Sequence, residues 1–454
     1  MSGGKLNGKI IWTDGVRGEA NTQLPPELAY KMGRAATIYF GEHSEGSPQI
    51  LIGRDTRISG EMLEASLVAG ICSAGGRAIL AGVVPTPAVA YLARKLHAAA
   101  GIVISASHNP FHDNGIKFFG GNGYKLPDKV EDEIEQIVRD LESGKDFSRP
   151  TGEEVGRLEY RQNLLEDYIS FVMNTTSERF DGMKIALDCA NGAAYKAMPT
   201  VLERLGAELI LLGDKPNGVN INDYCGSTHM ENLRLAVLRN HADIGIAHDG
   251  DADRCLCIDE RGDIIDGDHI MIICAKLMLA VDALPKKTVV STVMSNIGFR
   301  QALTELGLSC EITAVGDRYV LENMLANNHR LGGEQSGHII FSDYSTTGDG
   351  LITALQVLTA MKKFKAKASE LNALMTTYPQ VLLNVKVRDK EACKNSEAVK
   401  LAIAEGETEL GTTGRILVRP SGTEPLIRVM AEGPDKNQLN RICNKIAAEV
   451  EKCN

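Results

Sequence analysis

The sequence predicts an α/β protein made of three related α/β domains with mixed sheets, followed by a smaller C-terminal α+β domain. The first observation is size: 454 residues, 43% of them hydrophobic, are enough for several cores, because one domain takes roughly 100–200 residues. The second is a repeated order of strand, turn, helix, small-residue or glycine stop and strand, which occurs three times. The third is that the C-terminal region follows a different order.

The three repeats begin at residues 50, 184 and 288. In the first repeat we expect a strand at 50–55, a helix at 60–74 and a strand at 78–82. In the second, the expected strand, helix and strand are 184–189, 193–205 and 208–213. In the third, they are 288–293, 296–306 and 310–316. One large doubly wound sheet containing all three repeats is the alternative, but their unequal spacing favours separate domains. The expected domains are 1–155, 156–258 and 259–374.

The C-terminal region, expected as a domain at 375–454, begins after a helical stretch that ends near Met375 and is punctuated by Tyr378-Pro379. The expected strands are 381–387, 415–418 and 426–430, a loop at 419–425 joins the last two, and a helix at 435–450 closes the chain. This order indicates a small α+β domain.

The net charge and the apolar runs exclude two classes of partner. A formal charge of −10 argues against a general binder of nucleic acid or anionic membranes, which usually presents a basic face. The most apolar run, Ile270–Ala283, is interrupted by Lys276, and the N-terminal residues lack an apolar signal core. The ten cysteines include no Cys-x-x-Cys pair, which is typical of reduced thiols. We therefore expect a cytoplasmic protein with no membrane and no nucleic-acid partner.

Three aspartates on alternate residues, Asp249, Asp251 and Asp253, indicate a hard-metal site. A calcium-binding helix-loop-helix shares this opening, and Glu260 falls at its twelfth position, but Arg254 stands where that loop requires glycine. The flanking residues also resemble strands rather than helices. Crowded carboxylates repel one another, and a cation that prefers oxygen ligands relieves the repulsion, so magnesium is the expected metal. A solvated acidic turn is the alternative, but it does not explain the position between two apolar runs.

Ser107 lies where the apolar run 101–104 ends in small polar residues and Pro110. His108 follows it, but adjacent residues of an extended chain point to opposite sides, so proximity does not make them a catalytic dyad. The Gly-x-Ser-x-Gly elbow of serine hydrolases is also absent. Taken alone, Ser-His-Asn-Pro is more typical of a polar turn than of a nucleophile. A hydroxyl together with a metal site, however, indicates phosphoryl transfer.

Two further groups of residues suit an anionic sugar ligand. Arg17, Arg54 and Arg57 could each hold an anion, although each alone is typical of a surface ion pair. The loop 419–425 is a stronger phosphate clamp, because its glycine lets backbone N–H groups approach an anion while neighbouring side chains add donors. These residues are Arg419, Ser421, Gly422 and Thr423.

The glycine-bounded loop 332–338 contains Glu334, Gln335, Ser336 and His338. A carboxylate, an amide, a hydroxyl and an imidazole together suit recognition of sugar hydroxyls and movement of a proton. A histidine near such a loop is often only a hydrogen-bonded structural residue. The loop alone leaves both interpretations open.

Taken in order, these motifs resemble the α-D-phosphohexomutase superfamily over nearly the whole chain. The seven matching motifs are Thr13–Gly18 (TDGVRG), Gly53–Arg57 (GRDTR), Ser105–Pro110 (SASHNP), Asp113–Phe118 (DNGIKF), Asp249–Arg254 (DGDADR), Gly333–His338 (GEQSGH) and Arg419–Pro425 (RPSGTEP). The resemblance implies four domains around a central cleft, the first three of one α/β topology.

The resemblance also implies roles for individual residues. Ser107 matches the serine that carries phosphate, and one phosphoserine oxygen completes the coordination of one Mg²⁺ per chain by Asp249, Asp251 and Asp253. Arg254 is expected beside that phosphate. The other catalytic residues that the resemblance implies are Lys117, His338, Arg17 and His108. Of these, Lys117 and His338 match residues proposed for proton transfer. The implied substrate contacts are Glu334 and Ser336 to sugar hydroxyls and Arg419, Ser421, Gly422, Thr423 and Arg428 to the phosphate that is not reacting.

The reaction implied by the resemblance moves a phosphoryl group between the two ends of a hexose phosphate. The phosphoserine gives its group to one end, a sugar 1,6-bisphosphate reorients, and the other phosphate returns to the serine. The implied ligands are a phosphorylated hexosamine, Mg²⁺ and a sugar 1,6-bisphosphate as activator and intermediate. The implied assembly is a homodimer.

The branch of the superfamily is indicated by fewer residues. Gln335, Gly422 and the pair Val16-Arg17 resemble members that interconvert glucosamine 6-phosphate and glucosamine 1-phosphate, feeding synthesis of UDP-N-acetylglucosamine and cell-wall precursors. The alternatives are a phosphomannomutase or phosphoglucomutase, a non-catalytic sugar-phosphate-binding protein of the same fold, and a metal-dependent phosphatase acting through the same serine. One departure is Ile11-Trp12, where family members commonly carry Phe-Gly, which leaves the role of the Arg17 loop open.

Overall fold

The computed structural model describes residues 15–453 except 44–45, 146, 162 and 422–424. The chain forms two compact units. The first comprises Met1–Val293 and Glu311–Asn372, and the second comprises Met294–Cys310 and Ala373–Asn454. Ile11 and Trp12, where the sequence departs from the family pattern, lie outside the described residues.

The first sheet has six strands in the order β1-β5-β4-β2-β3-β6. Its strands are β1 (Val16–Glu19), β2 (Gln49–Arg54), β3 (Arg77–Val83), β4 (Ala100–Ile104), β5 (Asp113–Gly120) and β6 (Arg157–Tyr160). Strand β2 is parallel to β3 and β4, whereas β5 is antiparallel to β4 and β1. The sheet is therefore mixed, as predicted.

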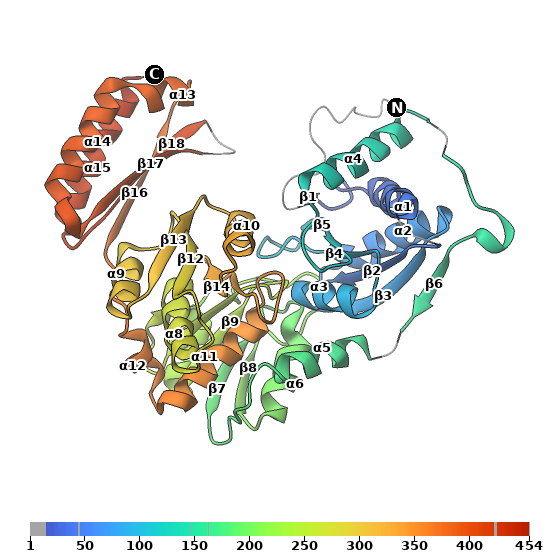
Figure 1. The fold of residues 1–454 in the computed structure, drawn as a ribbon, viewed down its shortest axis with the longest axis horizontal. Coiled ribbons are helices and arrows are strands. Elements are labelled where there is room, and N and C mark those ends of the chain that lie inside the picture. The colour runs from blue at the N-terminus through green and yellow to red at the C-terminus, as the bar shows by residue number, and fades with distance from the viewer. Residues whose placement is uncertain (1–14, 44–45, 146, 162, 422–424, 454) are drawn as a thin grey trace. The chain divides into compact units, whose positions relative to one another are not determined.

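Helices cover this first sheet because its strands alternate their side chains between two faces. The helices are α1 (Pro26–Glu42), α2 (Ser59–Ser73), α3 (Thr86–Lys95) and α4 (Asp128–Glu142), all in the blue and teal part of Figure 1. Ile50 and Ile52 share a core with Leu67 of α2. At Gly53, in contrast, a Cβ would lie 2.5 Å from Val89 of α3. The absence of a side chain at Gly53 therefore lets α3 pack closely against the sheet.

The second sheet has the order β11-β10-β9-β7-β8. Its strands are β7 (Lys184–Asp188), β8 (Glu208–Leu212), β9 (Ile244–His248), β10 (Cys255–Asp259) and β11 (Ile264–Ile265), and the helices of this region are α5 (Leu164–Met173), α6 (Ala194–Arg204) and α7 (Glu231–Asn240). Strands β9 and β10 are antiparallel, with Cys255 opposite His248. Residues 249–254 therefore form the short turn between two paired strands.

The third sheet has the order β13-β12-β14-β15. Its strands are β12 (Thr288–Thr292), β13 (Ser309–Thr313), β14 (Leu331–Gly333) and β15 (Ile339–Phe341), and the helices of this region within the first unit are α8 (Gly267–Ala280), α10 (Asp317–Asn327), α11 (Gly350–Phe364) and α12 (Ala368–Asn372). Strand β14 pairs with β12 in parallel and with β15 in antiparallel orientation. The glycine-bounded loop 332–338 comprises the end of β14 and the residues that connect it to β15.

The second unit contains an antiparallel sheet in the order β16-β18-β17. Its elements are α9 (Ile297–Glu305), β16 (Gln380–Lys386), α13 (Lys390–Asn395), α14 (Glu397–Leu410), β17 (Arg415–Pro420), β18 (Leu426–Glu432) and α15 (Lys436–Glu451). Ile427 and Val429 of the sheet share a core with Ile442 of α15. Helix α9 joins this unit, since the Ile297 N–H donates to Glu432 Oε2 at 3.1 Å.

The predicted fold class is confirmed. The described residues form four separate sheets, so the alternative of one large sheet is wrong. The predicted strands and helices of the three repeats agree with the observed ones to within one residue at each end, except that the strand expected at 310–316 ends at Thr313. The helical stretch expected to end near Met375 consists of two helices. The first, α11, is followed by Lys365 in the left-handed conformation, and the second, α12, ends at Asn372. No helix among the described residues has the length and apolar composition to cross a membrane.

Tyr168 of α5 binds a buried carboxylate at the start of α11. Its hydroxyl donates to Asp349 Oδ2 at 2.9 Å, while Asp349 Oδ1 accepts the N–H groups of Leu351 and Ile352 at 3.0 Å each. Burial raises the pKa of Asp349 to about 6, and the Tyr168 hydroxyl opposes that rise. The folded protein therefore holds this proton more tightly than the unfolded chain, and the resulting stabilisation is lost as pH rises through about 6.

We expect Tyr168→Phe to lower the free energy of unfolding by about 1.5–3 kcal/mol at about pH 8, where Asp349 is charged. The loss should be smaller at about pH 5, where the protonated carboxyl depends less on the donated hydrogen bond. Denaturant unfolding at both pH values measures the difference, with Tyr160→Phe as a control because Tyr160 is 79% exposed. Equal losses at the two pH values would contradict the assignment.

Candidate active site

Ser107 follows β4 in a tight loop, and its hydroxyl points at the acidic motif. Its φ is 51°, in the left-handed region, and the residue is buried. The Oγ atom donates to Asp249 Oδ2 at 2.5 Å. The Ser107 N–H donates to Ser105 Oγ at 2.9 Å, and Ser105 Oγ donates to Asp55 Oδ2 at 2.6 Å. The fold thereby joins a hydroxyl to a carboxylate 142 positions further along the chain.

Asp249, Asp251 and Asp253 lie in the turn between β9 and β10, and one carboxylate oxygen of each lies within 4.8 Å of the others. Burial raises the pKa of Asp249 well above its usual range, and the charges of Asp253 and Asp251 raise it further. Buried Asp251 Oδ1 and Asp253 Oδ1 accept no hydrogen bond from the described residues. Crowded, buried carboxylates with such oxygens fit a divalent cation that takes oxygen ligands, and Mg²⁺ is one.

Lys117 of β5 lies beside the acidic motif. Its Nζ is 2.9 Å from Asp251 Oδ2, and the Lys117 side chain is only 8% exposed. Thr86, at the start of α3, donates its hydroxyl to the same oxygen at 2.8 Å. Burial alone would raise the pKa of Asp251, but the neighbouring ammonium lowers it well below the usual range. One oxygen of Asp251 is thus held by Lys117 and Thr86, which leaves the other for a cation.

The glycine-bounded loop 332–338 lies against the acidic motif. Arg254 and His338 form an isolated antiparallel bridge, and the Cys255 N–H donates to the Gly337 carbonyl at 3.0 Å. These backbone contacts explain how two motifs far apart in the sequence come together. They place the His338 ring next to Asp253.

The His338 ring lies between two carboxylates. Its Nδ1 is 3.5 Å from Asp253 Oδ2, and its Nε2 is 3.4 Å from Asp317 Oδ2. Burial would lower the pKa of His338, but Asp253 and Asp317 outweigh it and raise the pKa to about 9. The Gly348 N–H also points at Nε2, at 3.0 Å, which suits a neutral ring with its proton on Nδ1. A cation that neutralised Asp253 would favour that neutral form, so His338 is suited to hold and release a proton.

Asp317 and Lys125 extend this arrangement away from the acidic motif. Lys125 Nζ is 2.7 Å from Asp317 Oδ2. Burial opposes ionisation of Asp317, but Lys125 and His338 lower its pKa well below the usual range. Both residues line a cavity of about 690 Å³. The cavity therefore borders the carboxylate that faces His338.

Glu334 and Ser336, the two residues expected to contact sugar hydroxyls, differ in their hydrogen-bond partners. Glu334 Oε1 accepts the Gly316 N–H at 3.2 Å, whereas the buried Ser336 Oγ has no hydrogen-bond partner among the described residues. The Gln335 amide donates instead to Asp266 Oδ2 at 3.1 Å, and Asp266 caps α8. The amide of Gln335 therefore supports the helix start.

Arg17 and His108 lie near one another beside the Ser107 loop. Arg17 is an exposed residue of β1, and its strand pairs with β5, which carries Lys117. Burial lowers the pKa of His108, and the positive charges of Arg254 and Arg17 lower it further. The buried Nδ1 of His108 has no hydrogen-bond partner within the described structure. Asp251 and Asp253 oppose this shift of the His108 pKa, so the ring lies among charges of both signs.

Arg54 forms the expected ion pairs, although its side chain is only 15% exposed, whereas the interpretation of Arg57 as a surface ion pair is wrong. Arg54 pairs with Glu61 and Glu64 at 3.0 and 3.4 Å. The Arg57 side chain is 0% exposed and pairs with Asp55 at 2.9 Å. Its other donors bind backbone carbonyls of the loop 107–113. Arg57 therefore cannot bind an external anion, because its donors are already used.

In the second unit, Arg419 of β17 lies directly opposite Arg428 of β18. Burial lowers the pKa of Arg419, and the charge of Arg428 lowers it further. Ser421 is buried, and Lys390 Nζ donates to its carbonyl at 2.8 Å. Like charges opposite one another are unfavourable, and an anion such as phosphate relieves them. Gly422 and Thr423, also expected in this clamp, lie outside the described residues.

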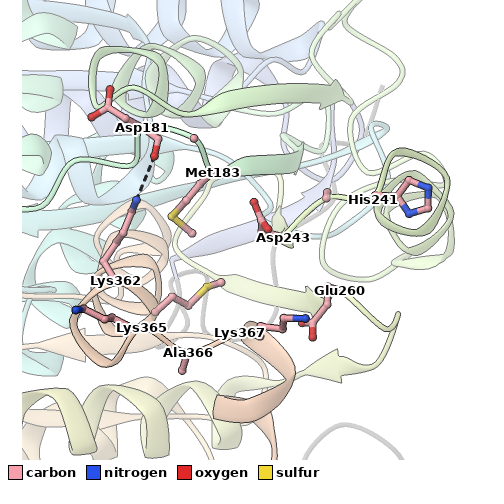
Figure 2. A pocket seen from close by; sticks show the side chains of 12 residues that line it. Asp181, Met183, His241, Asp243, Glu260, Lys362, Lys365, Ala366 and Lys367 are labelled. Carbon is pink, nitrogen blue, oxygen red and sulfur yellow. Dashed lines mark hydrogen bonds between the residues drawn. The ribbon is translucent and has the colours of Figure 1, made fainter.

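A second cavity of the first unit, of about 480 Å³, has a different lining (Figure 2). Lys362 donates to the Asp181 carbonyl at its edge, at 3.2 Å. Its other labelled residues are Met183, His241, Asp243, Glu260, Lys365, Ala366 and Lys367. It contains both acidic and basic groups and none of the candidate catalytic residues. It is therefore a cavity separate from the candidate site.

Four residues near the candidate site were not predicted from the sequence: Thr86, Lys125, Asn222 and Asp317. Thr86 and Asp317 stand at helix starts, where such residues usually have a local structural role. Asn222, whose Nδ2 donates to the Ser107 carbonyl at 2.9 Å, lies in a polar loop that also contains Asn217 and Asn220. No signal in the sequence distinguishes these residues, because their importance depends on contacts between distant segments.

Family models of phosphoglucomutase/phosphomannomutase domains match almost the entire chain. The α/β/α domains I, II and III match residues 8–145, 165–262 and 266–378, and the C-terminal domain matches 382–449. With the four sheets and the acidic site, these matches define the class: the chain belongs to the phosphoglucomutase/phosphomannomutase family.

Curated relatives specify the branch of the family. The chain is 53% identical over 447 residues to the phosphoglucosamine mutase of Brevibacillus brevis, covering 98% of this chain and 99% of the relative. It is 54% identical over 439 residues to that of Pelotomaculum thermopropionicum, covering 97% and 98%. The chain is a member of the phosphoglucosamine mutase branch.

Solved structures share the fold at much lower identity. A phosphoglucomutase/phosphomannomutase family protein from Burkholderia thailandensis has a TM-score of 0.82 at 23% identity, covering 98% of this chain and 97% of that protein. The Aspergillus fumigatus N-acetylphosphoglucosamine mutase, in complex with GlcNAc-6P and magnesium, has a TM-score of 0.69 at 17% identity, covering 98% and 95%. These likenesses support the four-domain α/β architecture.

Proposed function

We propose that this protein interconverts glucosamine 6-phosphate and glucosamine 1-phosphate through a phosphorylated Ser107. The observation that carries the proposal is the contact between Ser107 Oγ and Asp249 Oδ2, which places a hydroxyl at the edge of a three-carboxylate site. Ser107 is better described as a phosphate carrier than as an activated nucleophile, because no base of the serine-hydrolase type binds its hydroxyl; its partner is a carboxylate of the cation site.

In the first half-reaction, the bond between the phosphorus and Ser107 Oγ breaks, and a bond forms to a hydroxyl oxygen of the sugar phosphate. The departing Ser107 Oγ takes a proton from the Lys117 ammonium, and the proton of the sugar hydroxyl passes to the resulting Lys117 amine or to the neutral ring of His338, both residues being buried beside the acidic motif. The resulting 1,6-bisphosphate reorients and returns its other phosphoryl group to Ser107. Asp249, Asp251 and Asp253 would hold one Mg²⁺, which when bound would supply a Lewis acid for the charge of the phosphoryl oxygens.

Other residues of the chain bind the sugar hydroxyls and the phosphate groups. Ser336 Oγ, buried without a partner in the described structure, and the carboxylate of Glu334 suit sugar hydroxyls. Arg17, His108 and Arg254 supply positive or neutral groups around the Ser107 loop that can accept a phosphate. The Arg419–Arg428 pair binds a phosphate group of the substrate, with Ser421, Gly422 and Thr423 of the same loop.

The direct test follows conversion of glucosamine 6-phosphate to the 1-phosphate with Mg²⁺ and a trace of sugar 1,6-bisphosphate. We expect net isomerisation with little release of inorganic phosphate. Phosphate release equal to substrate loss would favour a phosphatase, and binding without conversion would favour a silent sugar-phosphate-binding protein. Parallel assays with mannose and glucose phosphates measure the preference within the family.

Arg419→Ala should raise KM for glucosamine 6-phosphate by roughly 10–100-fold, because one charge-assisted hydrogen bond to phosphate contributes about 1.5–3 kcal/mol. Phosphorylation of Ser107, read by intact mass, should stay at the wild-type level. Arg441→Ala is the matched control, since Arg441 pairs with Glu409 on the surface of the same unit. An unchanged KM in Arg419→Ala would remove Arg419 from the phosphate clamp.

The remaining expectations are proposals of the same kind. The chain is proposed to act in the cytoplasm as a homodimer, with domains at 1–155, 156–258, 259–374 and 375–454. The net charge of −10 supports the absence of a general nucleic-acid or anionic-membrane partner. Size-exclusion chromatography with light scattering tests the dimer.

A further inference from the structure

The side chains of Arg57 and Asn222 bind the backbone of the Ser107 loop, a role that the sequence did not predict for either residue. The Ser107 carbonyl accepts Arg57 Nη2 at 2.9 Å and Asn222 Nδ2 at 2.9 Å. The Asn109 carbonyl accepts the same two groups, at 2.8 and 3.0 Å. One guanidinium nitrogen and one amide nitrogen therefore bind the same two carbonyls of this loop.

The two donors come from different parts of the first unit. Arg57 follows β2 of the six-stranded sheet that also carries the Ser107 loop. Asn222 lies in the connection between β8 and α7, in the region of the sheet that carries the acidic motif. Its own N–H donates to the Ala190 carbonyl, just after β7, at 2.9 Å. Asn222 thus joins the phosphate-carrying loop to the region that holds the carboxylates.

The acidic motif itself packs against this junction. A Cβ at Gly250, between Asp249 and Asp251, would lie 2.5 Å from the Ser107 carbonyl oxygen and 2.8 Å from Asn222 Nδ2. Asn222 is 7% exposed, and its φ of 58° is in the left-handed region. Such a conformation is uncommon outside glycine, although asparagine tolerates it better than most residues. The fit between these two loops leaves little freedom for the position of Ser107.

We propose that Asn222 is a positioning residue for phosphoryl transfer: by binding the Ser107 and Asn109 carbonyls together with Arg57, it fixes Ser107 Oγ relative to Asp249 and its neighbouring carboxylates. This inference rests on the proposed function, since it concerns the step in which Ser107 gives up its phosphoryl group. Asn222 touches neither substrate nor the reacting atoms in this arrangement. It acts through the backbone of the loop.

The test compares Asn222→Ala and Asn222→Asp with wild type. The alanine variant removes both donated hydrogen bonds, and the aspartate variant keeps the shape while replacing the donor with an acceptor that faces two carbonyls. Asn232 supplies the matched control, because it is an exposed asparagine of the same region whose Nδ2 donates to the Tyr224 carbonyl at 2.9 Å. Asn232→Ala and Asn232→Asp should behave as wild type.

Each protein is first phosphorylated with glucose 1,6-bisphosphate, and its phosphoserine content is measured by intact mass. The rate of transfer to glucosamine 6-phosphate is then measured in a single turnover and divided by that content. We expect both Asn222 variants to lose about 10–100-fold in this rate, with KM within about twofold of wild type, because a displacement of about 1 Å at a reacting group has an effect of this size.

A structural role alone would lower the thermal unfolding midpoint without changing the rate per phosphorylated molecule, and that result would overturn the proposal. If the aspartate variant does not fold, because it buries an unpaired carboxylate against two carbonyls, the alanine variant still decides, since it removes the hydrogen bonds without adding a charge. Failure of wild type and the Asn232 variants to convert glucosamine 6-phosphate would instead count against the proposed function. The two failures are therefore distinguishable.

Discussion

Ser107→Ala is expected to lower kcat for glucosamine 6-phosphate by at least about 10⁴-fold, because it removes the only proposed acceptor of the phosphoryl group. The Ser107 hydroxyl is buried and donates to Asp249 at 2.5 Å, and alanine offers no oxygen atom at that position to carry a phosphoryl group. Intact mass after incubation with glucose 1,6-bisphosphate should show one added phosphate on wild type and none on the variant.

Ser143→Ala is the matched control for this experiment. Ser143 is an exposed serine whose hydroxyl donates only to a carbonyl of its own helix end, that of Asp140 at 2.8 Å. Turnover and phosphate content should match wild type. Comparable turnover in Ser107→Ala and Ser143→Ala would show that Ser107 does not carry the phosphate, whatever the substrate.

The repeated order of strands and helices could be predicted from the sequence because it depends on local patterns. Alternating and continuous apolar runs bounded by glycine predict β7 and α6 to within about a residue. The position of Asp249–Arg254 between two strands was predicted on the same basis and is confirmed as the β9–β10 turn. Local patterns also explain why the strand that precedes Ser107 was recognised.

Contacts between distant segments could not be predicted in this way. A charged guanidinium such as that of Arg57 suggests a surface residue, yet Arg57 is fully buried because carbonyls of another loop satisfy its donors. In the sequence, Asn222 resembles the other asparagines of its loop. Only the fold shows that its side chain donates to the Ser107 carbonyl. The role of such residues depends on the packing of one loop against another, which composition and periodicity do not encode.

Removal of divalent cations should stop turnover, and Asp253→Asn should weaken the response to Mg²⁺. We expect EDTA to lower the activity of wild type by about 10³-fold, since a Lewis acid contributes several kcal/mol to phosphoryl transfer. Added Mg²⁺ should restore wild type and fail to restore Asp253→Asn at the same concentration. Asp263→Asn, which changes an exposed carboxylate of the same region, should respond as wild type.

Thermal unfolding with and without Mg²⁺ tests directly whether Asp253 is a metal ligand. The charge of Asp253 is the largest charge repulsion on buried Asp249, so Asp253→Asn should make the metal-free protein equally stable or more stable. With saturating Mg²⁺ the order should reverse, because wild type gains the binding free energy of a three-carboxylate site and the variant gains less. A solvated acidic turn predicts no such crossing, since its charges do not share a cation. Unfolding midpoints that shift equally with Mg²⁺ in both proteins would therefore exclude Asp253 as a metal ligand.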